Sequence, residues 1–570
     1  MTAQTVPPVL QVTGLTVRFG GSTPVKGISF DLKPGERVGL VGESGSGKSL
    51  TALSIMRLAK TAKVEGVVAL DGVNLLDVPE RQMTKVRGGK ISMVYQDPMS
   101  SLNPMQTIGQ QLVEAIRLHE KISVSQARPR ALALLEEVGV SYPSERLNQY
   151  PHEFSGGMCQ RVMIAMAMSA RPRVLIADEP TTALDVTTQA RIIDLLDRLA
   201  NDYGTAVILI THDLGVAAGF CERIHVMREG EIVESALAND LYANPQHPYT
   251  KKLLGAVVDL TTDVTAPIPA GREGTETITA VRGRSLTPAA GAKRKTLIEV
   301  AGISKTYRLG DGRIVSAVDD VSFQITKGET FGLVGESGSG KSTVAKAVLA
   351  LTSINRGSVT FGDQDLHALS RGELRSARRS MQMVFQDPYS ALNRRQTASE
   401  IIEAPLVAHR LGTRQSRKEQ VREMIHLVGL SDDFAHRKPR TLSGGQCQRV
   451  AIARALVLTP DFVVLDESVS ALDVSIQAQI LNLLRRLQGE LGLTYLFISH
   501  DLAVIRYMAT TVAVMQKGRI VEQASRDDLF TNPQHEYTKT LMAAIPIPDP
   551  TQERARRRRA SELATQFDDR

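Results

Sequence analysis

Two identical stretches decide the fold of this chain: Gly42-Glu43-Ser44-Gly45-Ser46-Gly47-Lys48-Ser49 and Gly335-Glu336-Ser337-Gly338-Ser339-Gly340-Lys341-Ser342. Each fits the pattern GxxxxGK[ST], in which small residues let backbone N–H groups wrap phosphates. The lysine of this pattern reaches the terminal phosphates, and the last hydroxyl is a ligand of Mg²⁺. The candidate nucleotide contacts are Gly42, Ser44, Gly45, Gly47, Lys48 and Ser49, and in the second copy Gly335, Ser337, Gly338, Gly340, Lys341 and Ser342. The chain is therefore predicted to bind two nucleoside triphosphates.

The repeat extends over most of the 570 residues, because the same residues follow each phosphate loop in the same order and with nearly the same spacing. A chain of this length exceeds what one hydrophobic core usually organises. We expect one domain over 8–258 and a second over 296–548. The segment 259–295 is rich in Thr, Ala, Gly, Pro and Arg and is expected to be a linker. The polar tail 549–570, with its arginine run at 554–559, is expected to be disordered.

Within each half, apolar runs alternate with segments of helical period, which predicts an α/β fold around a largely parallel sheet. Residues 37–41 are predicted to be the strand that leads into the first phosphate loop, and residues 48–58 the helix that leaves it. Residues 174–177 and 206–210 are predicted to be further buried strands. This order of strand, loop and helix is the context that a phosphate loop needs.

Composition excludes several classes of protein. Hydrophobic residues make up 42% and charged residues 23%, and no apolar run is long enough to cross a bilayer. The net charge of +7 is spread over intermixed basic and acidic residues, which favours an ordinary solvated surface over nucleic-acid binding. The three cysteines are widely separated and indicate neither a disulfide framework nor a metal cluster.

An acidic pair follows a predicted buried strand in each half: Asp178-Glu179 and Asp466-Glu467. The first acid of such a pair would hold Mg²⁺, and the second would orient and deprotonate the attacking water. Acids at a strand end can also simply cap a helix, but the upstream phosphate loop favours the catalytic interpretation. His212 and His500 each follow the next apolar strand. They are predicted to contact the γ-phosphate, although a lone histidine is more often structural.

The motifs Ser155-Gly156-Gly157 and Ser443-Gly444-Gly445 resemble the signature loop of ATP-binding-cassette proteins. This resemblance covers nearly the whole chain. It implies that each loop binds the γ-phosphate held by the opposite domain, with its backbone N–H groups at a helix N-terminus. Further resemblances are Gln96 and Gln386 to the Q-loop that senses Mg²⁺ and water, residues 183–185 and 471–473 to the D-loop, and Phe19 and Tyr307 to the aromatic residue that stacks on adenine. For either aromatic residue, core packing is the alternative.

The resemblance implies tandem P-loop domains, each with a mainly parallel sheet, an antiparallel β subdomain and a helical subdomain. The two halves would form a head-to-tail sandwich around two ATP molecules with Mg²⁺. Both sites retain a lysine, an acid and a histidine, so both are expected to hydrolyse ATP. Two positions depart from the family pattern: Met158 stands where glutamine is common, and Ser468-Val469 where Pro-Thr is common.

Residues 97–104 and 387–394 after each Q-loop, and the closing motifs 244–250 and 532–538, resemble the ATPase subunits of oligopeptide, dipeptide, nickel and glutathione importers. This resemblance implies two transmembrane permeases, an extracytoplasmic solute-binding protein, and a peripheral position on the cytoplasmic face of the inner membrane. The alternatives are the tandem ATPase of another importer class and a soluble mechanical ATPase acting on ribosomes or nucleic acid. The solute itself stays open.

Overall fold

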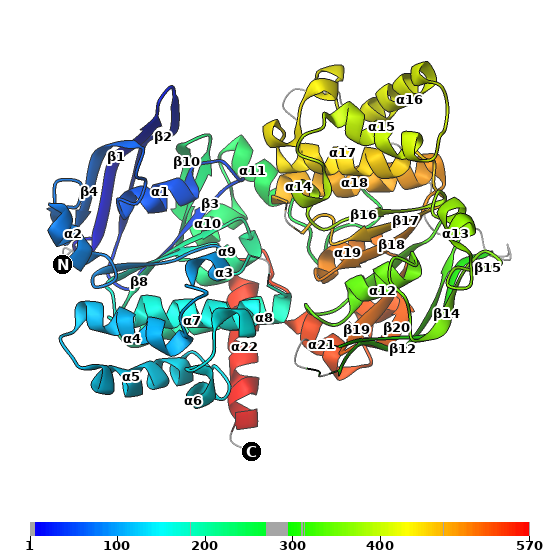
Figure 1. Cartoon of the computed structure of the whole chain (residues 1–570). Helices are drawn as coiled ribbons and strands as arrows, with labels where there is room; N and C mark the ends of the chain where they lie inside the picture. The colour runs from blue at the N-terminus through cyan, green and yellow to red at the C-terminus, as the bar shows by residue number, and fades with distance from the viewer. Residues whose placement is uncertain are drawn as a thin grey trace. The chain divides into compact units, whose positions relative to one another are not determined.

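The computed structural model of the chain describes residues 6–182, 184–269, 295–308, 312, 314–470 and 472–568. It contains two compact units: unit 1 comprises Met1–Val257 with Pro546–Arg570, and unit 2 comprises Val258–Ile545. The chain thus passes from one unit to the other twice (Figure 1). Residues 270–294 of the predicted linker lie outside the described residues, as do Ala183 and Ala471 of the predicted D-loops.

Each unit is built on a six-stranded sheet, of order β10-β9-β3-β8-β7-β6 in unit 1 and β16-β17-β18-β13-β19-β20 in unit 2. Neighbouring strands are parallel except at one edge, where β10 and β20 run antiparallel. The strands of unit 1 are β3 (Arg37–Val41), β6 (Ile91–Val94), β7 (Val174–Asp178), β8 (Ala206–Thr211), β9 (Arg223–Arg228) and β10 (Glu231–Leu237). Those of unit 2 are β13 (Thr330–Val334), β16 (Met381–Val384), β17 (Phe462–Asp466), β18 (Thr494–Ser499), β19 (Thr511–Gln516) and β20 (Arg519–Ser525). The predicted α/β class is confirmed.

A smaller antiparallel sheet accompanies each central sheet, in the order β2-β1-β4-β5 and β12-β11-β14-β15. In unit 1 the strands are β1 (Leu10–Phe19), β2 (Ser22–Leu32), β4 (Lys63–Leu70) and β5 (Val73–Asn74). In unit 2 they are β11 (Thr296–Arg308), β12 (Ile314–Thr326), β14 (Arg356–Phe361) and β15 (Gln364–Asp365). These sheets are the expected antiparallel subdomains.

The central sheet of unit 1 separates two hydrophobic cores, because successive side chains of a strand point to opposite faces. In β7, Val174 and Ile176 belong to the core shared with the antiparallel sheet, whereas Leu175 and Ala177 belong to the core under the helices. Strand β8 alternates in the same way. Burial on both faces explains why these strands are continuous apolar runs in the sequence.

Helices cover these cores, and α4, α5 and α7 pack together as a helical subdomain of unit 1, as α15, α16 and α17 do in unit 2 (Figure 1). The helices of unit 1 are α1 (Lys48–Ile55), α2 (Glu80–Val86), α3 (Pro98–Ser101), α4 (Ile108–His119), α5 (Val124–Glu137), α6 (Pro143–Arg146), α7 (Gly156–Met168), α8 (Val186–Tyr203), α9 (Leu214–Phe220), α10 (Ala238–Ala243) and α11 (Pro248–Gly255). Those of unit 2 are α12 (Lys341–Val348), α13 (Arg371–Ala377), α14 (Pro388–Ala391), α15 (Ala398–Ala408), α16 (Arg414–Leu427), α17 (Gly444–Leu456), α18 (Val474–Leu491), α19 (Leu502–Met508), α20 (Arg526–Thr531) and α21 (Glu536–Ala543). No helix in the described part of the chain is long and apolar enough to span a membrane.

The arginine-rich tail differs from the sequence-based expectation of disorder, because it forms α22 (Pro550–Asp568) and belongs to unit 1. Its first turns carry a buried carboxylate, Glu553, and an arginine, Arg557, that pairs with two acids of α8. These contacts offset the repulsion that a run of arginines predicts. Residues 259–269 of the predicted linker likewise belong to a folded unit, unit 2.

Candidate functional site

The predicted catalytic residues of each half converge at the carboxyl edge of its central sheet. In unit 1 the phosphate loop follows β3, Asp178 ends β7, His212 follows β8 and Gln96 follows β6. These strands are parallel neighbours, so their carboxyl ends share one edge, where ligands bind in open α/β sheets. Unit 2 repeats the arrangement with β13, β17, β18 and β16.

The phosphate loop needs glycine where its backbone crosses other chain segments. Gly42 has φ 152°, and a Cβ there would lie 2.2 Å from the carbonyl oxygen of Met227. Gly335 has φ 159°, and a Cβ there would lie 2.2 Å from the carbonyl oxygen of Met515. Gly47 and Gly340, at the amino ends of α1 and α12, are in the left-handed conformation. The positions predicted from the repeat therefore have a backbone that only glycine adopts without strain.

The two phosphate-loop lysines are buried against the loop they serve. Lys48 is 4% exposed, and its Nζ donates to the carbonyl oxygens of Gly42 at 2.7 Å and Glu43 at 2.8 Å. Lys341 makes the same contacts with its own loop at 2.7 and 2.8 Å. The loop thus holds the ammonium group in a concave turn, where a phosphate oxygen could replace one of the carbonyl partners.

The loop serine and the first acid form an oxygen pair in each unit. Ser49 Oγ donates to Asp178 Oδ1 at 2.9 Å, and Ser342 Oγ donates to Asp466 Oδ1 at 3.1 Å. Burial raises the pKa of Asp178 to about 6, with the neighbouring Glu179 adding to the rise and Ser49 opposing it. The pKa of Asp466 is raised by the same causes.

This pair fits Mg²⁺. The ion takes hydroxyl and carboxylate oxygens, often with only one or two protein ligands and the rest from water and phosphate. Burial makes the ionised form of these two carboxylates costly in the free protein, and a bound cation would offset that cost. Ser49 with Asp178, and Ser342 with Asp466, would therefore hold the ion, and Gln96 and Gln386 lie at the same sheet edge.

The second acid of each pair contacts the predicted glutamine and histidine. Gln96 Nε2 donates to Glu179 Oε2 at 2.7 Å, and His212 Nδ1 lies 3.3 Å from Glu179 Oε1. A further donor is the hydroxyl of Thr182, 2.9 Å from Glu179 Oε2. Burial acts to raise the pKa of Glu179, but His212, Thr182 and Lys48 together hold it below its usual value. The carboxylate is thus ionised at neutral pH and able to accept a proton from water.

Unit 2 has the same cluster, with the same glutamine distance and a longer histidine distance to the acid. Gln386 Nε2 donates to Glu467 Oε2 at 2.7 Å, His500 Nδ1 lies 3.6 Å from the same oxygen, and Lys341 Nζ lies 3.9 Å from Oε1. Burial lowers the pKa of His500, but Glu467 and Asp501 outweigh it and raise the pKa. Burial acts to raise the pKa of Glu467, but His500 and Lys341 outweigh it and hold the pKa below its usual value. Glu179 and Glu467 both have a left-handed backbone, φ 46° and 44°. Such strain in a non-glycine residue is typical of functional sites.

The predicted signature serines lie at helix amino ends. Ser155 caps α7 and Ser443 caps α17. In α17 the side chain of Gln446 also accepts from the backbone N–H of Ser443 at 3.0 Å, which completes a capping box. Met158 occupies the matching position in α7 and cannot accept this bond. Of the two departures from the family pattern, Met158 therefore has a local structural consequence.

The second glycine of each signature motif is required by a close helix crossing. A Cβ at Gly157 would lie 2.7 Å from Thr188 Cγ2 of α8, and a Cβ at Gly445 would lie 2.5 Å from Ile476 Cγ2 of α18. A Cβ at Gly156 or Gly444 would meet only ordinary contacts. The close crossing places the amino end of each signature helix beside the start of the helix that follows the catalytic acid.

The two candidate adenine-stacking residues differ in their surroundings. Phe19, at the end of β1, is partly buried and packs against the core of unit 1. Tyr307 lies on β11, is 41% exposed, and has Lys305 Nζ 5.2 Å from its ring centroid. Phe19 thus has the core contacts of the alternative interpretation, whereas Tyr307 presents a surface ring.

One pair of supporting residues was missed in the sequence. The hydroxyl of Tyr249 accepts from the backbone N–H of Glu43 at 3.2 Å, and the hydroxyl of Tyr537 accepts from Glu336 at 3.1 Å. Both tyrosines belong to the closing motifs 244–250 and 532–538, whose recurrence was recognised without a structural role. That recurrence was the available signal. The closing motif of each half thus supports its own phosphate loop.

Comparisons with known proteins show which family the chain belongs to. The family described as "ABC transporter" matches residues 25–182 and 318–470, and the family described as "Oligopeptide/dipeptide transporter, C-terminal region" matches 233–279 and 521–568. The chain is 44% identical over 579 residues to the glutathione import ATP-binding protein GsiA of Salmonella choleraesuis (strain SC-B67), which covers 96% of this chain and 91% of that protein. It is 43% identical over 607 residues to the oligopeptide transport ATP-binding protein OppD of Mycobacterium bovis, which covers 95% of this chain and 99% of that protein. A solved dimer of the ATP-binding cassette MJ0796 with ADP and Pi aligns with TM-score 0.38 and 32% identity, over 40% of this chain and 99% of that one.

Proposed function

The chain belongs to the ABC transporter family, and from that premise we propose that it hydrolyses Mg²⁺-ATP in both halves to power solute import through a pair of membrane permeases. The observation that carries this proposal is the cluster of glutamine, histidine and lysine around Glu179 and around Glu467. Two copies of a catalytic cluster, neither lacking a charged group, favour turnover at both.

The residues have distinct roles in the proposed reaction. Lys48 and Lys341 would neutralise the terminal phosphates. Glu179 and Glu467, ionised at neutral pH, would orient the attacking water and accept its proton, and the neighbouring histidines would contact the γ-phosphate. Mg²⁺, when bound by the serine and aspartate oxygens, would supply positive charge that offsets the charge of the phosphates.

We further propose that each site is completed by the other half. The site of Lys48, Ser49, Gln96, Asp178, Glu179 and His212 would receive Ser443 and Gly445. The site of Lys341, Ser342, Gln386, Asp466, Glu467 and His500 would receive Ser155 and Gly157. Support comes from the exposed capping position of Ser155 and Ser443 at helix amino ends, where backbone N–H groups stabilise an anion.

The completion of one site by the other half can be tested in a chain with a single active acid. In the Glu467→Gln chain, turnover would come from the Lys48 site. Ser443→Arg should then abolish it by blocking closure on that nucleotide, whereas Ser155→Arg should reduce it much less. Steady-state phosphate release measures both variants. Equal loss in both would mean that Ser443 has no special relation to the Lys48 site.

The proposed cargo is a peptide-type solute, such as a peptide or glutathione. The support is the oligopeptide/dipeptide C-terminal region matched in both halves, together with the glutathione and oligopeptide import for which the two relatives are named. The partners would be two permeases and an extracytoplasmic solute-binding protein, with this chain peripheral on the cytoplasmic face. Reconstitution with a pair of permeases of the oligopeptide or glutathione importer type, followed by ATP-dependent uptake of labelled glutathione and of di- and oligopeptides, tests the cargo. Co-purification with ribosomes in place of membranes would contradict the transport proposal.

A further inference from the structure

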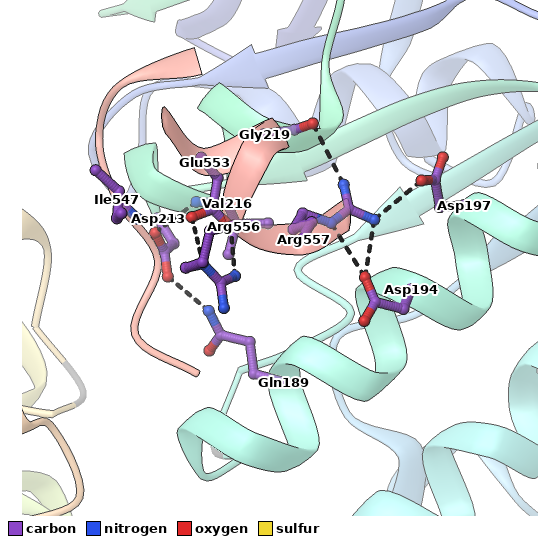
Figure 2. A network of polar contacts seen from close by, with 10 residues as sticks. All are labelled: Gln189, Asp194, Asp197, Asp213, Val216, Gly219, Ile547, Glu553, Arg556 and Arg557. Atoms are coloured by element: carbon purple, nitrogen blue, oxygen red, sulfur yellow. Dashed lines mark hydrogen bonds and ion pairs between the residues drawn. The ribbon is translucent and has the colours of Figure 1, made fainter. Parts of the chain in front are cut away.

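Residues 546–559 lie on unit 1 against α8 and α9 (Figure 2), and α22 also contacts α10. Helix α9 (Leu214–Phe220) is the element of most interest, because it begins two residues after His212. The segment thus packs against the helix that immediately follows a predicted catalytic histidine. We name residues 546–559 the terminal brace.

Helix α9 is shaped to receive the terminal brace. Gly215 and Gly219, four residues apart, lie on one face of the helix. A Cβ at Gly215 would lie 2.7 Å from Pro546 Cβ, and a Cβ at Gly219 would lie 2.4 Å from Glu553 Cγ. Side chains at either position would therefore push the brace away. The close contact depends on glycine at both ends of this face.

Arg557 ties the terminal brace to two helices at once. Its guanidinium donates to the carbonyl oxygen of Gly219 at 3.3 Å, to Asp194 Oδ1 at 3.1 Å and to Asp197 Oδ2 at 3.0 Å. Its side chain is 13% exposed, so these charge-assisted bonds are largely shielded from solvent. Arg557 therefore fixes the carboxyl end of α9 to the middle of α8 (Figure 2).

Glu553 keeps the terminal brace folded at the point where it crosses α9. It is 2% exposed, accepts from the backbone N–H of Ile547 at 2.9 Å, and pairs with Arg556 at 2.5 Å. A buried carboxylate with such partners is expensive to disrupt, since removing one partner leaves an uncompensated charge. The brace is thus a defined structure and not a loosely attached tail.

The contacts continue from α8 to the catalytic histidine. Gln189 of α8 donates to Asp213 Oδ2 at 2.7 Å, and Asp213 Oδ1 accepts from the backbone N–H of Val216 at 3.0 Å. Asp213 is the neighbour of His212 in the chain, and His212 Nδ1 lies 3.3 Å from Glu179 Oε1. The segment carrying His212 is therefore held both by α8 and by α9, the two helices that Arg557 joins.

Unit 2 receives a different segment at the matching place. Asn482 of α18, which matches Asp194 in the repeat, accepts from the backbone N–H of Ile268 at 3.0 Å and donates to its carbonyl oxygen at 2.9 Å. Tyr507 of α19 donates to the carbonyl oxygen of Ala266 at 3.1 Å. Unit 2 thus binds the segment that follows the closing motif 244–250, and unit 1 binds the segment that follows the closing motif 532–538.

The two gripping surfaces have different charges. Arg557 meets the carboxylates of Asp194 and Asp197 in unit 1. In unit 2 the position that matches Asp197 is Arg485, which donates to the carbonyl oxygen of Ala266 at 3.3 Å. An arginine there would repel Arg557, so the surface of unit 2 disfavours the terminal brace. The extensions are therefore not interchangeable.

We propose that Arg557 and Glu553 are positioning residues for ATP hydrolysis at the Glu179 site: by fixing α9 to α8, the terminal brace sets the place of His212. The proposal rests on the proposed hydrolysis at that site. Under this proposal the terminal brace, which follows the second half in the sequence, sets the position of His212 in the first half. This connection is separate from the proposed sharing of the nucleotide sites.

Two readouts on the full-length chain test the proposal, with Arg558→Ala as the matched control because Arg558 is a neighbouring exposed arginine. The first readout is hydrogen–deuterium exchange, which needs no turnover. Arg557→Ala should raise exchange over 212–220 and leave 500–508 unchanged. The second is kinetics in the Glu467→Gln chain, where kcat should fall roughly fivefold with KM for ATP little changed, as for a misplaced catalytic group.

Charge reversal provides a rescue. Arg557→Asp should act like Arg557→Ala, and adding Asp194→Arg should restore part of the protection over 212–220 and part of kcat. The proposal is wrong if Arg557→Ala matches Arg558→Ala in both readouts, or if exchange rises equally over 212–220 and 500–508, which indicates a general loss of stability. Absence of turnover in the unchanged chain would refute the proposed hydrolysis, and the exchange readout would still decide whether the brace holds α9.

Discussion

Unit 1 and unit 2 hold the glutamates proposed to be catalytic with different hydrogen bonds, although the surrounding motifs are nearly identical. In unit 1 the hydroxyl of Thr182 donates to the carboxylate of Glu179 at 2.9 Å. The matching residue in unit 2 is Ser470, whose hydroxyl donates at 2.9 Å to the backbone carbonyl oxygen of Glu467. His212 is also closer to its glutamate, at 3.3 Å, than His500 is, at 3.6 Å.

A duplicated motif can therefore preserve every charged group and still produce two unequal sites. The χ1 angle of a threonine is restricted because its Cβ is branched, whereas a serine side chain rotates more freely toward the nearest acceptor. The carboxylate of Glu179 is therefore more firmly oriented.

The largest effect is expected for the catalytic acids themselves. Glu179→Gln and Glu467→Gln should each remove turnover at their own site by about 10²-fold or more, the size expected when a general base and its charge are lost. Phosphate release measured for each single variant and for the double variant checks this. If one single variant keeps the full activity of the unchanged chain, the site it removes is idle and the comparison becomes one of an active and an inactive half.

A second prediction concerns the stability that the folded protein loses by burying the carboxylate of Asp178. Its folded-state pKa of about 6 exceeds the usual 3.8, so the folded protein holds the proton more tightly. Stability should therefore fall as pH rises from about 4 to 6 and stay lower above, with a cost of about 1–3 kcal/mol at pH 7. Without Mg²⁺, Asp178→Asn should raise the Tm at pH 7 and flatten its dependence on pH.

The corresponding variant Asp466→Asn should act in the same direction, because the pKa of Asp466 is also raised by burial. Added Mg²⁺ should remove the advantage of either variant, since the ion stabilises only the charged form. A Tm that is unchanged by both substitutions at pH 7 would show that these carboxylates are compensated in the free protein.

Thr182 should account for part of the inequality between the units. Thr182→Val keeps the shape and removes the hydroxyl, so Glu179 loses one donor, worth about 1–2 kcal/mol to a charged acceptor. We expect kcat in the Glu467→Gln chain to fall by roughly three- to tenfold. Ser470→Ala in the Glu179→Gln chain is the matched control and should have little effect, because that hydroxyl serves a backbone oxygen. Equal losses would mean that the Thr182 bond is not what distinguishes the sites.

The smallest effect is expected at the signature helices. Met158→Gln would allow α7 to form the reciprocal capping bond that Gln446 makes in α17, a gain of about 0.5–1 kcal/mol in stability. Gln446→Met should cost unit 2 a similar amount. Chemical denaturation of the full chain, followed by exchange over residues 155–168 and 443–456, measures both. If Met158→Gln raises the stability but leaves hydrogen exchange over 155–168 unchanged, the gain does not come from the new capping bond.

The parts of the structure that follow from local sequence were predicted well, namely the strands and the phosphate loops between β3 and α1 and between β13 and α12. Glycine and lysine spacing, apolar runs and acids at strand ends each report on their own neighbourhood. Tyr249 and the terminal brace were missed for the opposite reason. Tyr249 contacts a loop 206 positions away, and Arg557 contacts Asp194 363 positions away.

The arginine run at 554–559 shows the limit most clearly. By itself it predicts repulsion and disorder. In the structure Arg557 faces two aspartates of α8, and Arg554 donates to the carbonyl oxygen of Cys221 at 3.0 Å. No pattern within the tail indicates these acceptors. The relation of the signature loops to the opposite site stays a prediction.

The hydrogen bond between each closing tyrosine and its phosphate loop has a consequence for how the protein is made. A ribosome releases Glu43 long before Tyr249, and Glu336 long before Tyr537. During synthesis, every residue of the phosphate loop, both acids and the histidine can emerge while the loop still lacks this acceptor. Domains generally fold as units as the chain emerges, the first before the second. The phosphate loop of the first half would therefore gain this acceptor only when α11 has been translated, and unit 1 would be completed later still, when Pro546–Arg570 emerges.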